Sequence, residues 1–398
     1  MEPLIRAISS SPTGFDLHSK KISILAYMDD LALVANSSES LQQMLDIPSQ
    51  AAEWMGLRFS PKKCASLHVE GGTRALVRPS QFLIQGESMT SFKEREIYQH
   101  LGTPTGVRVR QTPEDTIAEI LRDAAQIDSS LLTPWQKINA LNTFLIPRIS
   151  FVLRGSAMAK VPLNKADSTI RQLVKKWLHL PQRACTDISY IPHRQSGANV
   201  PRMADLCDVA VMTHTFRLLT CPDLTVRSIA QEAVRGVVRK HIAGAPSERD
   251  VATLSGSLEA EFGREGGDLS SLWSRARNAS RCLSKRIGCC WKWCKERQEL
   301  GILVPRVKTP NHTIVTPTAR DMLERSLKDA IRCHYAENLK QKPDQGKMFE
   351  VSSKWDASNH FLPGGSFTRF AVWRFIHRAQ LNCVPFNEAI RHGNRDKR

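Results

Sequence analysis

The sequence predicts an α+β fold, with strands gathered in the first hundred residues and helices in most of the remainder. Three observations predict it. Residues 22–35 hold two apolar runs around a pair of aspartates, residues 64–101 hold further short apolar runs, and apolar residues recur at helical spacing from residue 114 onward. The length of 398 residues allows two or three domains, each able to bury a core.

Residues 22–35 predict a β-hairpin. Each half is an apolar run of strand length, and Asp29 and Asp30 between the halves are residues that favour turns. The hairpin would therefore present two neighbouring carboxylates at its tip.

A helix is expected after the hairpin. Ser37 or Ser38 can cap its start, Gly56 is a suitable C-terminal stop, and Pro48 inside the pattern predicts a kink or a break. Further strands are expected at three short apolar runs, 64–69, 82–84 and 97–101.

Helices are expected to dominate from residue 114. Thr133-Pro134 predicts the start of a helix that Pro147 ends, and Pro181 closes the next helix. Residues 243–271, rich in Gly, Ser and Glu, predict a linker or mobile loop. Helical patterns resume at 272–300 and 317–340, and a last apolar and basic segment covers 367–384.

The net charge of +17 is unevenly distributed along the chain. The first hundred residues carry a net charge of −1, and the three sections that follow carry +6, +4 and +8. Such an imbalance favours a polyanionic partner, because basic side chains neutralise phosphates and release counterions. A merely soluble basic protein would have the same composition, so charge alone leaves both interpretations open.

The composition disfavours several classes of protein. Ten cysteines in so long a chain predict reduced thiols, mostly in packed interiors, rather than a disulfide scaffold. Residues 1–8 lack the apolar core of a signal peptide. No apolar run approaches the roughly 18–20 residues that span a membrane. We therefore expect a soluble, intracellular protein.

The pair Asp29 and Asp30 is the best candidate for chemistry. Two carboxylates crowded into apolar surroundings repel each other and resist ionisation, and a bound Mg²⁺, which takes hard oxygen ligands, removes that difficulty. In nucleotidyl transfer, two such ions roughly 4 Å apart activate the attacking oxygen and stabilise the leaving one. An ordinary Asp-Asp turn is the alternative, and the pair alone does not decide between the two.

The sequence around the pair resembles a known family. Tyr27-Met28-Asp29-Asp30 within an apolar hairpin resembles the catalytic hairpin of reverse transcriptases. Residues 56–64, Gly-Leu-Arg-Phe-Ser-Pro-Lys-Lys-Cys, are similar to the palm element that follows in that family, and residues 98–102, Tyr-Gln-His-Leu-Gly, resemble its primer grip. The three motifs stand in the family's order and spacing, so we accept the resemblance.

The resemblance implies a role for each matching residue. Asp29 would bind Mg²⁺ or Mn²⁺ with Asp30 as its supporting carboxylate, and Lys63 would protonate the pyrophosphate leaving group. The residues expected beside the nucleotide and primer are Tyr27, Met28, Tyr98, Leu101 and Gly102. A solvated lysine is the alternative for Lys63. A plain tight turn is the alternative for the last two residues, and there both interpretations can hold together.

Later motifs are similar to those of the non-LTR retrotransposon branch. Residues 133–137 and 145–148 resemble the thumb of these enzymes. Residues 177–181 with 191–197 resemble the region after the thumb, where a short strand precedes a glycine-rich turn. Residues 373–385 look like the stretch before the zinc knuckle in site-specific elements that carry a restriction-like endonuclease.

The resemblance implies three domains. They are a partial polymerase palm, an antiparallel sheet with helices, over 1–106; a helical thumb over 107–195; and a basic, mostly helical connector over 196–398, with its flexible segment near 243–271. The family's first catalytic aspartate and its fingers have no counterpart here, and the chain stops before any zinc knuckle or nuclease. We therefore expect a reverse transcriptase truncated at both ends that does not polymerise alone.

Nucleic acids are the partners that the resemblance implies, with element RNA as template and target DNA as primer. The absent fingers, zinc knuckle and nuclease regions would be further partners, no membrane is involved, and we expect the nucleus rather than the cytoplasm. Two other functions stay open. The chain would be an RNA-binding module whose aspartates are relics, or a non-functional relic of a decayed mobile element.

Residues 282–297 offer a rival site. Cys290 and Cys294 fit only half of a structural zinc site, which pairs its ligands as C-x₂₋₄-C twice, so a helix that packs Trp291 and Trp293 over thiols is expected instead. Basic residues among these tryptophans would contact nucleic acid by phosphate neutralisation and stacking, or simply face the solvent.

Overall fold

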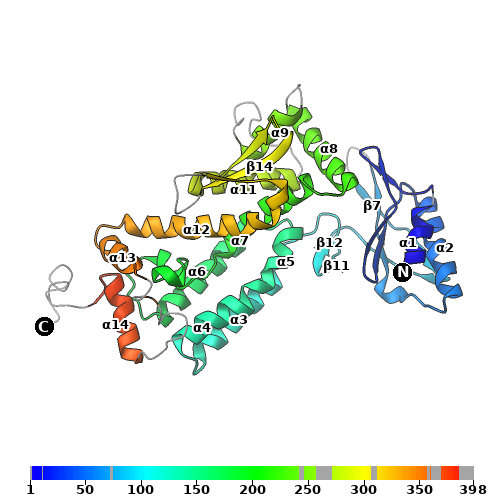
Figure 1. The fold of residues 1–398 in the computed structure, drawn as a ribbon. Coiled ribbons are helices and arrows are strands. Elements are labelled where there is room, and N and C mark those ends of the chain that lie inside the picture. The colour runs from blue at the N-terminus through cyan, green and yellow to red at the C-terminus, as the bar shows by residue number, and fades with distance from the viewer. Residues whose placement is uncertain are drawn as a thin grey trace. The chain divides into compact units, whose positions relative to one another are not determined.

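The structure is a computed structural model that describes residues 2–10, 12–71, 75–241, 246–256, 271–305, 312–355, 359 and 369–384. The chain forms two compact units, one of residues 1–111 with 222–236 and one of residues 112–221 with 237–398 (Figure 1). Short strands fill the first unit and helices most of the second. The predicted α+β class is therefore confirmed.

Short strands and two helices make up most of the first unit. Its elements are α1 (Glu2–Ser9), β1 (Phe15–Leu17), β2 (Lys20–Ile22), β3 (Ile24–Tyr27), β4 (Asp30–Leu33), α2 (Ser38–Trp54), the 3-10 turn η1 (Pro61–Lys63), β5 (Ala65–Ser66), β6 (His68–Glu70), β7 (Leu76–Arg78), β8 (Leu83–Ile84), β9 (Glu87–Ser88), β10 (Thr90–Ser91), β11 (Tyr98–His100) and β12 (Thr103–Thr105). The strands expected at 64–69, 82–84 and 97–101 are present, although shorter.

The strands of the first unit pair as separate two-stranded ladders. The antiparallel ladders are β1–β2, β3–β4, β6–β7, β8–β9 and β11–β12, and β5 pairs with β10 in parallel. Each strand has only two to four residues, which is too short to align several neighbours into one sheet. The single antiparallel sheet that was expected is not formed by the described residues.

Helix α2 begins and ends where its sequence predicts. The Ser37 hydroxyl accepts a hydrogen bond from the Ser40 N–H at 3.2 Å, which caps the start. The helix ends before Gly56, whose φ of 69° is a left-handed conformation that glycine adopts without strain. The predicted break at Pro48 is wrong, because the helix continues through that residue.

The core of the first unit is small. Leu45 of α2 packs with Phe82 and Ile84, and several partly buried apolar side chains surround them. Leu4 and Ile8 of α1 are buried in the same unit, and α1 packs against α2. This unit thus buries few side chains for its length, and apolar residues of its strands stay exposed.

Helices dominate the second unit. Its elements are α3 (Glu114–Ser129), α4 (Pro134–Ala140), the π-helical turn η2 (Leu141–Leu145), α5 (Pro147–Gly155), α6 (Lys160–Trp177), the 3-10 turns η3 (Thr186–Ser189) and η4 (His193–Gln195), α7 (Met203–Leu219), α9 (Pro246–Ser255), α11 (Leu272–Ile287), β13 (Cys290–Cys294), β14 (Glu299–Pro305), β15 (His312–Val315), η5 (Pro317–Met322), α12 (Leu323–Lys340), α13 (Gln345–Ser353) and α14 (Phe370–Gln380). Helix α8 (Leu224–His241) starts among the residues of the first unit and ends among those of the second.

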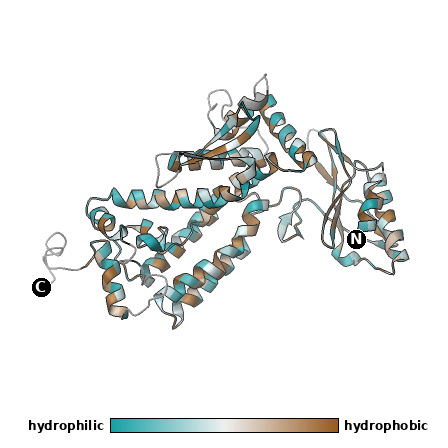
Figure 2. Cartoon of the chain, in the orientation of Figure 1, coloured by the Kyte–Doolittle hydropathy of each residue, from teal (hydrophilic) through white to brown (hydrophobic). Residues whose placement is uncertain are grey.

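Helix α7 is the centre of the second unit. Thirteen of its 17 residues are buried, and α5, α6, α11 and α12 all pack against it. Its buried residues lie on every side, as expected of a helix surrounded by others, and they include the charged Asp205 and Asp208. Several other helices, such as α3 and α6, carry hydrophobic and hydrophilic residues on different faces (Figure 2).

Two predictions about helix boundaries in this unit need correction. Thr133 does cap α4 with a capping box, but Pro147 begins α5 instead of ending the preceding helix, because proline has no N–H to lose at a first helical position. Residues 246–255, expected to lie in a linker, form α9 with Leu254 buried. The rest of the predicted 243–271 linker lies largely outside the described residues.

The region after α6 contains a tight turn but no strand. Residues 186–189 and 193–195 are 3-10 turns where a short strand was expected, so that prediction is wrong. The Gly197 N–H donates to the Pro192 carbonyl at 3.1 Å, and a Cβ at Gly197 would collide with the Ile191 carbonyl. This close approach explains why glycine is needed here.

Residues 290–305 are strands, and the helix expected there is wrong. β13, β14 and β15 form an antiparallel sheet. Trp291 is buried, and its Nε1 donates to the Ser280 Oγ of α11 at 2.8 Å, while its ring lies 6.1 Å from that of Phe216 in α7. Trp291 therefore joins the sheet to α11 and α7.

All ten cysteines are free thiols. Cys207, Cys289 and Cys383 are buried and the other seven are half-buried, so the expectation that most lie in packed interiors overstates their burial. Among the described helices, none has the length and apolar character needed to cross a membrane.

Candidate catalytic hairpin

The predicted hairpin is present. β3 and β4 pair with Tyr27 opposite Asp30, so that Met28 and Asp29 form a two-residue loop. Met28 has a φ of 54°, which is unusual for a residue with a side chain and makes the loop tight. Asp29 thus stands in the loop, and Asp30 is the first residue of β4.

The tip of this hairpin is open to solvent. Tyr27 is 60% exposed, Met28 is 78% exposed, and both aspartates are exposed. The expectation of a low-dielectric setting for the two carboxylates is therefore wrong for the described chain, because water can solvate both of them. What the structure offers is a pair of accessible, neighbouring carboxylates on a short rigid loop.

The structure brings Lys63 and Tyr98 together. Lys63 ends η1, and its carbonyl accepts a hydrogen bond from the Tyr98 hydroxyl at 3.0 Å. The Tyr98 ring lies 5.3 Å from that of Phe92, which holds it in place. The Lys63 side chain is exposed, so its amino group is accessible to a ligand.

Leu101 and Gly102 form the two-residue loop between β11 and β12, as predicted. Their φ angles are 49° and 71°, so both are left-handed, which is the geometry of a type I′ hairpin turn. Leu101 adopts this conformation against the preference of a residue with a Cβ. Among the described residues, no hydrogen bond or ion pair joins this turn to Asp29 or Asp30.

The carboxylate oxygens at the hairpin tip supply part of the ligand set that a hard divalent cation requires. Carboxylate oxygens are the ligands that Mg²⁺ and Mn²⁺ prefer. Among the described residues, however, no group of three or more His, Cys, Asp or Glu side chains gathers in a way that could hold a metal. Asp29 and Asp30 therefore supply two ligands, and a complete site requires more.

The motifs that resemble the thumb and later regions lie in the second unit and contact one another. Trp135 of α4 packs against Trp373 of α14 at 5.7 Å between ring centroids. Trp177 at the end of α6 donates from Nε1 to Asp128 of α3 at 2.9 Å, and Lys176 pairs with the same carboxylate. These residues serve packing of the helices.

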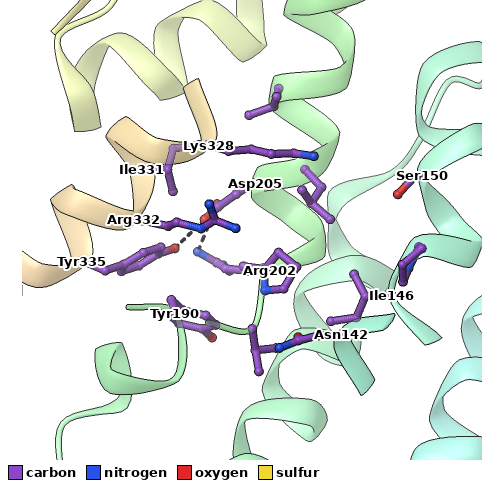
Figure 3. A pocket seen from close by; sticks show the side chains of 15 residues that line it. Asn142, Ile146, Ser150, Tyr190, Arg202, Asp205, Lys328, Ile331, Arg332 and Tyr335 are labelled. Atoms are coloured by element: carbon purple, nitrogen blue, oxygen red, sulfur yellow. Dashed lines mark hydrogen bonds and ion pairs between the residues drawn. The ribbon is translucent and has the colours of Figure 1, made fainter. Parts of the chain in front are cut away.

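A buried ionic network in the second unit escaped the sequence analysis. Both oxygens of Asp205 on α7 accept hydrogen bonds from Arg286, at 2.6 and 2.9 Å, and the Tyr335 hydroxyl donates to one of them at 2.6 Å. Figure 3 shows Tyr335 and Arg202 directed at Asp205. The sequence could not predict this network from Asp205 alone, because its partners are 81 and 130 residues away along the chain.

A cavity of about 200 Å³ lies beside this network (Figure 3). Each basic side chain on its wall already has a carboxylate partner: Arg202 pairs with Asp167 and Asp205, Lys328 with Glu324, and Arg332 with Asp329. The charges of this cavity therefore compensate one another, and the network holds α7, α11 and α12 together.

The rival site of cysteines and tryptophans is part of the sheet β13–β15. Trp291 is buried, and Arg286 belongs to the network around Asp205, so neither is available for nucleic acid. Lys292 is exposed on β13. The helix α11 ends at Ile287, so the basic residues from Lys292 onward do not lie on a helix.

Comparison with known proteins places these features in a family. Residues 1–104 match the family model described as reverse transcriptase (RNA-dependent DNA polymerase), and residues 209–383 match the model described as the T26G10.4 domain. The hairpin, Lys63 and the turn at Leu101-Gly102 all fall inside the first match.

Three relatives cover different shares of the chain. The uncharacterized protein T26G10.4 of Caenorhabditis elegans is 23% identical over 345 residues, which are 83% of this chain and 95% of that protein. The Retrovirus-related Pol polyprotein from type-2 retrotransposable element R2DM of Drosophila melanogaster is 29% identical over 58% of this chain, and its counterpart from type-1 retrotransposable element R2 of Nasonia vitripennis is 27% identical over 50%. These two matches span only 22% and 20% of the polyproteins.

The first part of the chain is therefore similar to reverse transcriptases. The chain is a relative of the Pol polyproteins of R2 non-LTR retrotransposons. These matches favour a reverse transcriptase fragment over the two alternatives, the RNA-binding module and the relic. Reverse transcriptases as a family use divalent metal ions and act on nucleic acids.

Proposed function

We propose that the hairpin β3–β4 is the catalytic hairpin of an RNA-directed DNA polymerase, and that Asp29 and Asp30 hold Mg²⁺ or Mn²⁺ there. One observation carries the proposal: two exposed, adjacent carboxylates stand at the tip of a tight hairpin within the segment that matches the reverse transcriptase family. Oxygen ligands on a rigid loop are what such a cation requires. The cation would activate the attacking oxygen of the DNA terminus.

The other predicted site residues take supporting roles in this proposal. Lys63 would donate a proton to the leaving pyrophosphate, and its exposed side chain leaves the amino group accessible. Tyr27 and Met28 would contact the primer end and the incoming nucleotide. The Tyr98 hydrogen bond to Lys63 supports a common site for the general acid and the primer-positioning turn Leu101-Gly102.

The domain assignment is also a proposal. A palm over 1–106, a thumb over 107–195 and a connector over 196–398 agree with a first compact unit whose leading segment ends at residue 111 and with the helices α3 to α6 that follow. The connector would be mixed rather than mostly helical in its middle, because β13 to β15 lie there.

The relatives suggest the nucleic-acid partners and the cellular location that we propose. Element RNA would serve as template and target DNA as primer, together with protein regions that correspond to the rest of the longer R2 polyproteins. Action on chromosomal DNA requires the nucleus, so we propose a nuclear location.

Binding of Mn²⁺ tests the metal role directly. The paramagnetic ion should broaden NMR signals of residues at the tip of β3–β4 in the wild-type chain. Asp29→Asn and Asp30→Asn should each weaken Mn²⁺ binding at least about tenfold, because each removes a charged ligand. Glu87→Gln, which changes another exposed carboxylate of the same unit, is the control and should bind as wild type does. Equal binding by wild type and Asp29→Asn would overturn the metal role.

Primer extension tests the catalytic role. The described residues gather two carboxylates at the tip, fewer than two cations require, so the purified chain with primed RNA and Mg²⁺ should give no templated incorporation. Incorporation that Asp29→Asn abolishes would contradict this inactivity while supporting the catalytic hairpin. Incorporation that survives Asp29→Asn would refute both.

A further inference from the structure

A second cavity, of about 460 Å³, lies within the second unit among α7, α11 and the start of α6. It has a size typical of ligand pockets, which range over roughly 300–1,000 Å³. None of the residues predicted at the catalytic hairpin lines it. Asp29 and Asp30 are therefore not part of this cavity.

The cations of this cavity are not all compensated. Lys160 pairs with the buried Asp208 at 2.6 Å. Arg275 and Lys285 on α11 have no carboxylate partner within ion-pair distance in the described part of the chain, and Arg275 makes only a long hydrogen bond to the Ser271 carbonyl at 3.4 Å. This distinguishes the cavity from the one beside Asp205, where every basic side chain is paired.

An unpaired, half-buried guanidinium is costly and calls for an anion. Burial lowers the pKa of Arg275, which reports the cost of removing its charge from water. Arginine nevertheless stays protonated in proteins. Its planar fork of donors matches the oxygens of a phosphate, and Lys285 adds a point charge of the same sign.

The two cations lie along the same stretch of α11. They are ten residues apart, which places them about 15 Å from each other along the helix axis. Between them, α11 also contributes Asn278, Arg281 and Cys282 to the wall. Apolar surface is provided by Ala279 of α11, Val211 of α7 and Met158. The cavity thus combines anion-binding groups with a surface suited to an uncharged, organic part of a ligand.

We propose that this cavity binds a nucleotide unit, with Arg275 or Lys285 holding its phosphate and the wall of Met158, Val211 and Ala279 receiving its sugar or base. The shared chemistry is a phosphate ester on an apolar body. The nucleotide is either free or part of an RNA strand. A strand would engage both cations through phosphates of nucleotides that are not adjacent, because the cations lie about 15 Å apart. The site lies outside the catalytic hairpin and goes beyond the polymerase role.

Equilibrium binding distinguishes these sources. The probes are adenosine 5′-monophosphate, measured by calorimetry, and a fluorescent single-stranded RNA of ten nucleotides, measured by anisotropy at several salt concentrations. Wild type should bind the RNA, and Arg275→Gln and Lys285→Gln should each make the slope of log K against log salt shallower by about 0.7, the value for one lost phosphate contact on a single strand. Lys292→Gln, which removes an exposed lysine outside the cavity, should behave as wild type.

The binding results distinguish a free nucleotide from an RNA strand as the ligand. Binding of the monophosphate that is lost in the double variant identifies a free nucleotide as the ligand, and binding of the RNA alone identifies a strand. Arg275→Lys, which keeps the charge and the fold, should retain most of the affinity. Failure of wild type to bind either probe overturns the proposal, as does unchanged binding by Arg275→Gln and Lys285→Gln. Neither result bears on Mn²⁺ binding at the hairpin.

Discussion

The two units differ in the burial of their charged side chains. In the first unit, Asp29, Asp30 and Lys63 are exposed, and the strands of this unit form separate two-stranded ladders. In the second unit, Asp205 and Asp167 are buried under helices and held by partners distant in sequence. Two-stranded ladders are marginally stable in water, whereas a helix such as α7, buried on all sides, brings a large apolar core.

This contrast assigns different tasks to the units. Exposed carboxylates keep their hydration and can exchange it for a cation, so their loss changes binding more than folding. Buried carboxylates have lost their hydration and stabilise the fold through their hydrogen-bond and ion-pair partners. Removing one therefore lowers the free energy of unfolding. We therefore expect the same substitution, aspartate to alanine, to have opposite consequences in the two units.

The largest effect is expected at Asp205. Asp205→Ala leaves Arg286 largely buried without its bidentate partner and should lower the free energy of unfolding by about 3 kcal/mol. Urea unfolding followed by tryptophan fluorescence measures it, because all tryptophans except Trp54 lie in the second unit.

Two matched variants sharpen this result. Asp329→Ala removes a half-exposed partner of Arg332 on α12 and is followed by the same fluorescence. Asp29→Ala removes a carboxylate of the hairpin in the first unit and is followed by hydrogen exchange of the β3–β4 amides. Both should change the free energy of unfolding by no more than about 0.5 kcal/mol. A large loss with Asp29→Ala, or none with Asp205→Ala, would break the contrast between the units.

An intermediate effect is expected from the pH dependence at Asp167. This carboxylate accepts hydrogen bonds from the Met203 and Ala204 N–H groups at 2.7 and 3.0 Å, but burial outweighs them and raises its pKa to about 6 from 3.8. Between pH 4 and pH 6 the folded chain keeps a proton that the unfolded chain releases. The contribution of Asp167 to stability therefore falls as the pH rises through this window and is constant above it.

The variant Asp167→Asn removes that titration. Between pH 4 and pH 7 the wild type should lose roughly 1–3 kcal/mol of unfolding free energy relative to Asp167→Asn. Asp344→Asn, at an exposed position of the same unit, is the control and should show no such change. A wild type that instead gains stability over this range, relative to Asp167→Asn, would mean that the hydrogen bonds outweigh burial.

The sequence predicted local features well and distant pairings poorly. Ser37 and Gly56 mark the ends of α2 through bonds that span three to five residues, and the turn at Leu101-Gly102 depends on its own two φ angles. The network around Asp205 and the position of Trp291 depend on residues from other elements. Tertiary burial of the apolar residues of 290–305 selected strands there, against a pattern taken as helical.

The same distinction applies to the candidate site. The hairpin and the place of its aspartates at the tip follow from a motif of four residues. The Tyr98 bond to Lys63 joins two motifs that the sequence had already assigned to one site. The solvent exposure of the tip was not predicted, because an apolar neighbourhood in sequence does not imply a buried neighbourhood in space. Lys285 belongs to the basic stretch within 282–297 that the sequence offered for nucleic acid. Arg275 was missed, because a cation without a partner is recognised only in three dimensions.

The smallest effect is expected at the loop of the hairpin. Met28 has a φ of 54°, which costs a residue with a Cβ about 1–2 kcal/mol, so Met28→Gly removes strain while adding flexibility to the unfolded chain. The net result should be a local gain of about 0.5 kcal/mol, measured as slower hydrogen exchange of the β3–β4 amides. Ala26→Gly, on β3 beside the loop, is the control and should speed exchange, because glycine at an extended position has no strain to relieve. If Met28→Gly also speeds exchange, the Met28 side chain contributes contacts that outweigh its strained backbone, and the tip of the first unit is better packed than its 78% exposure implies.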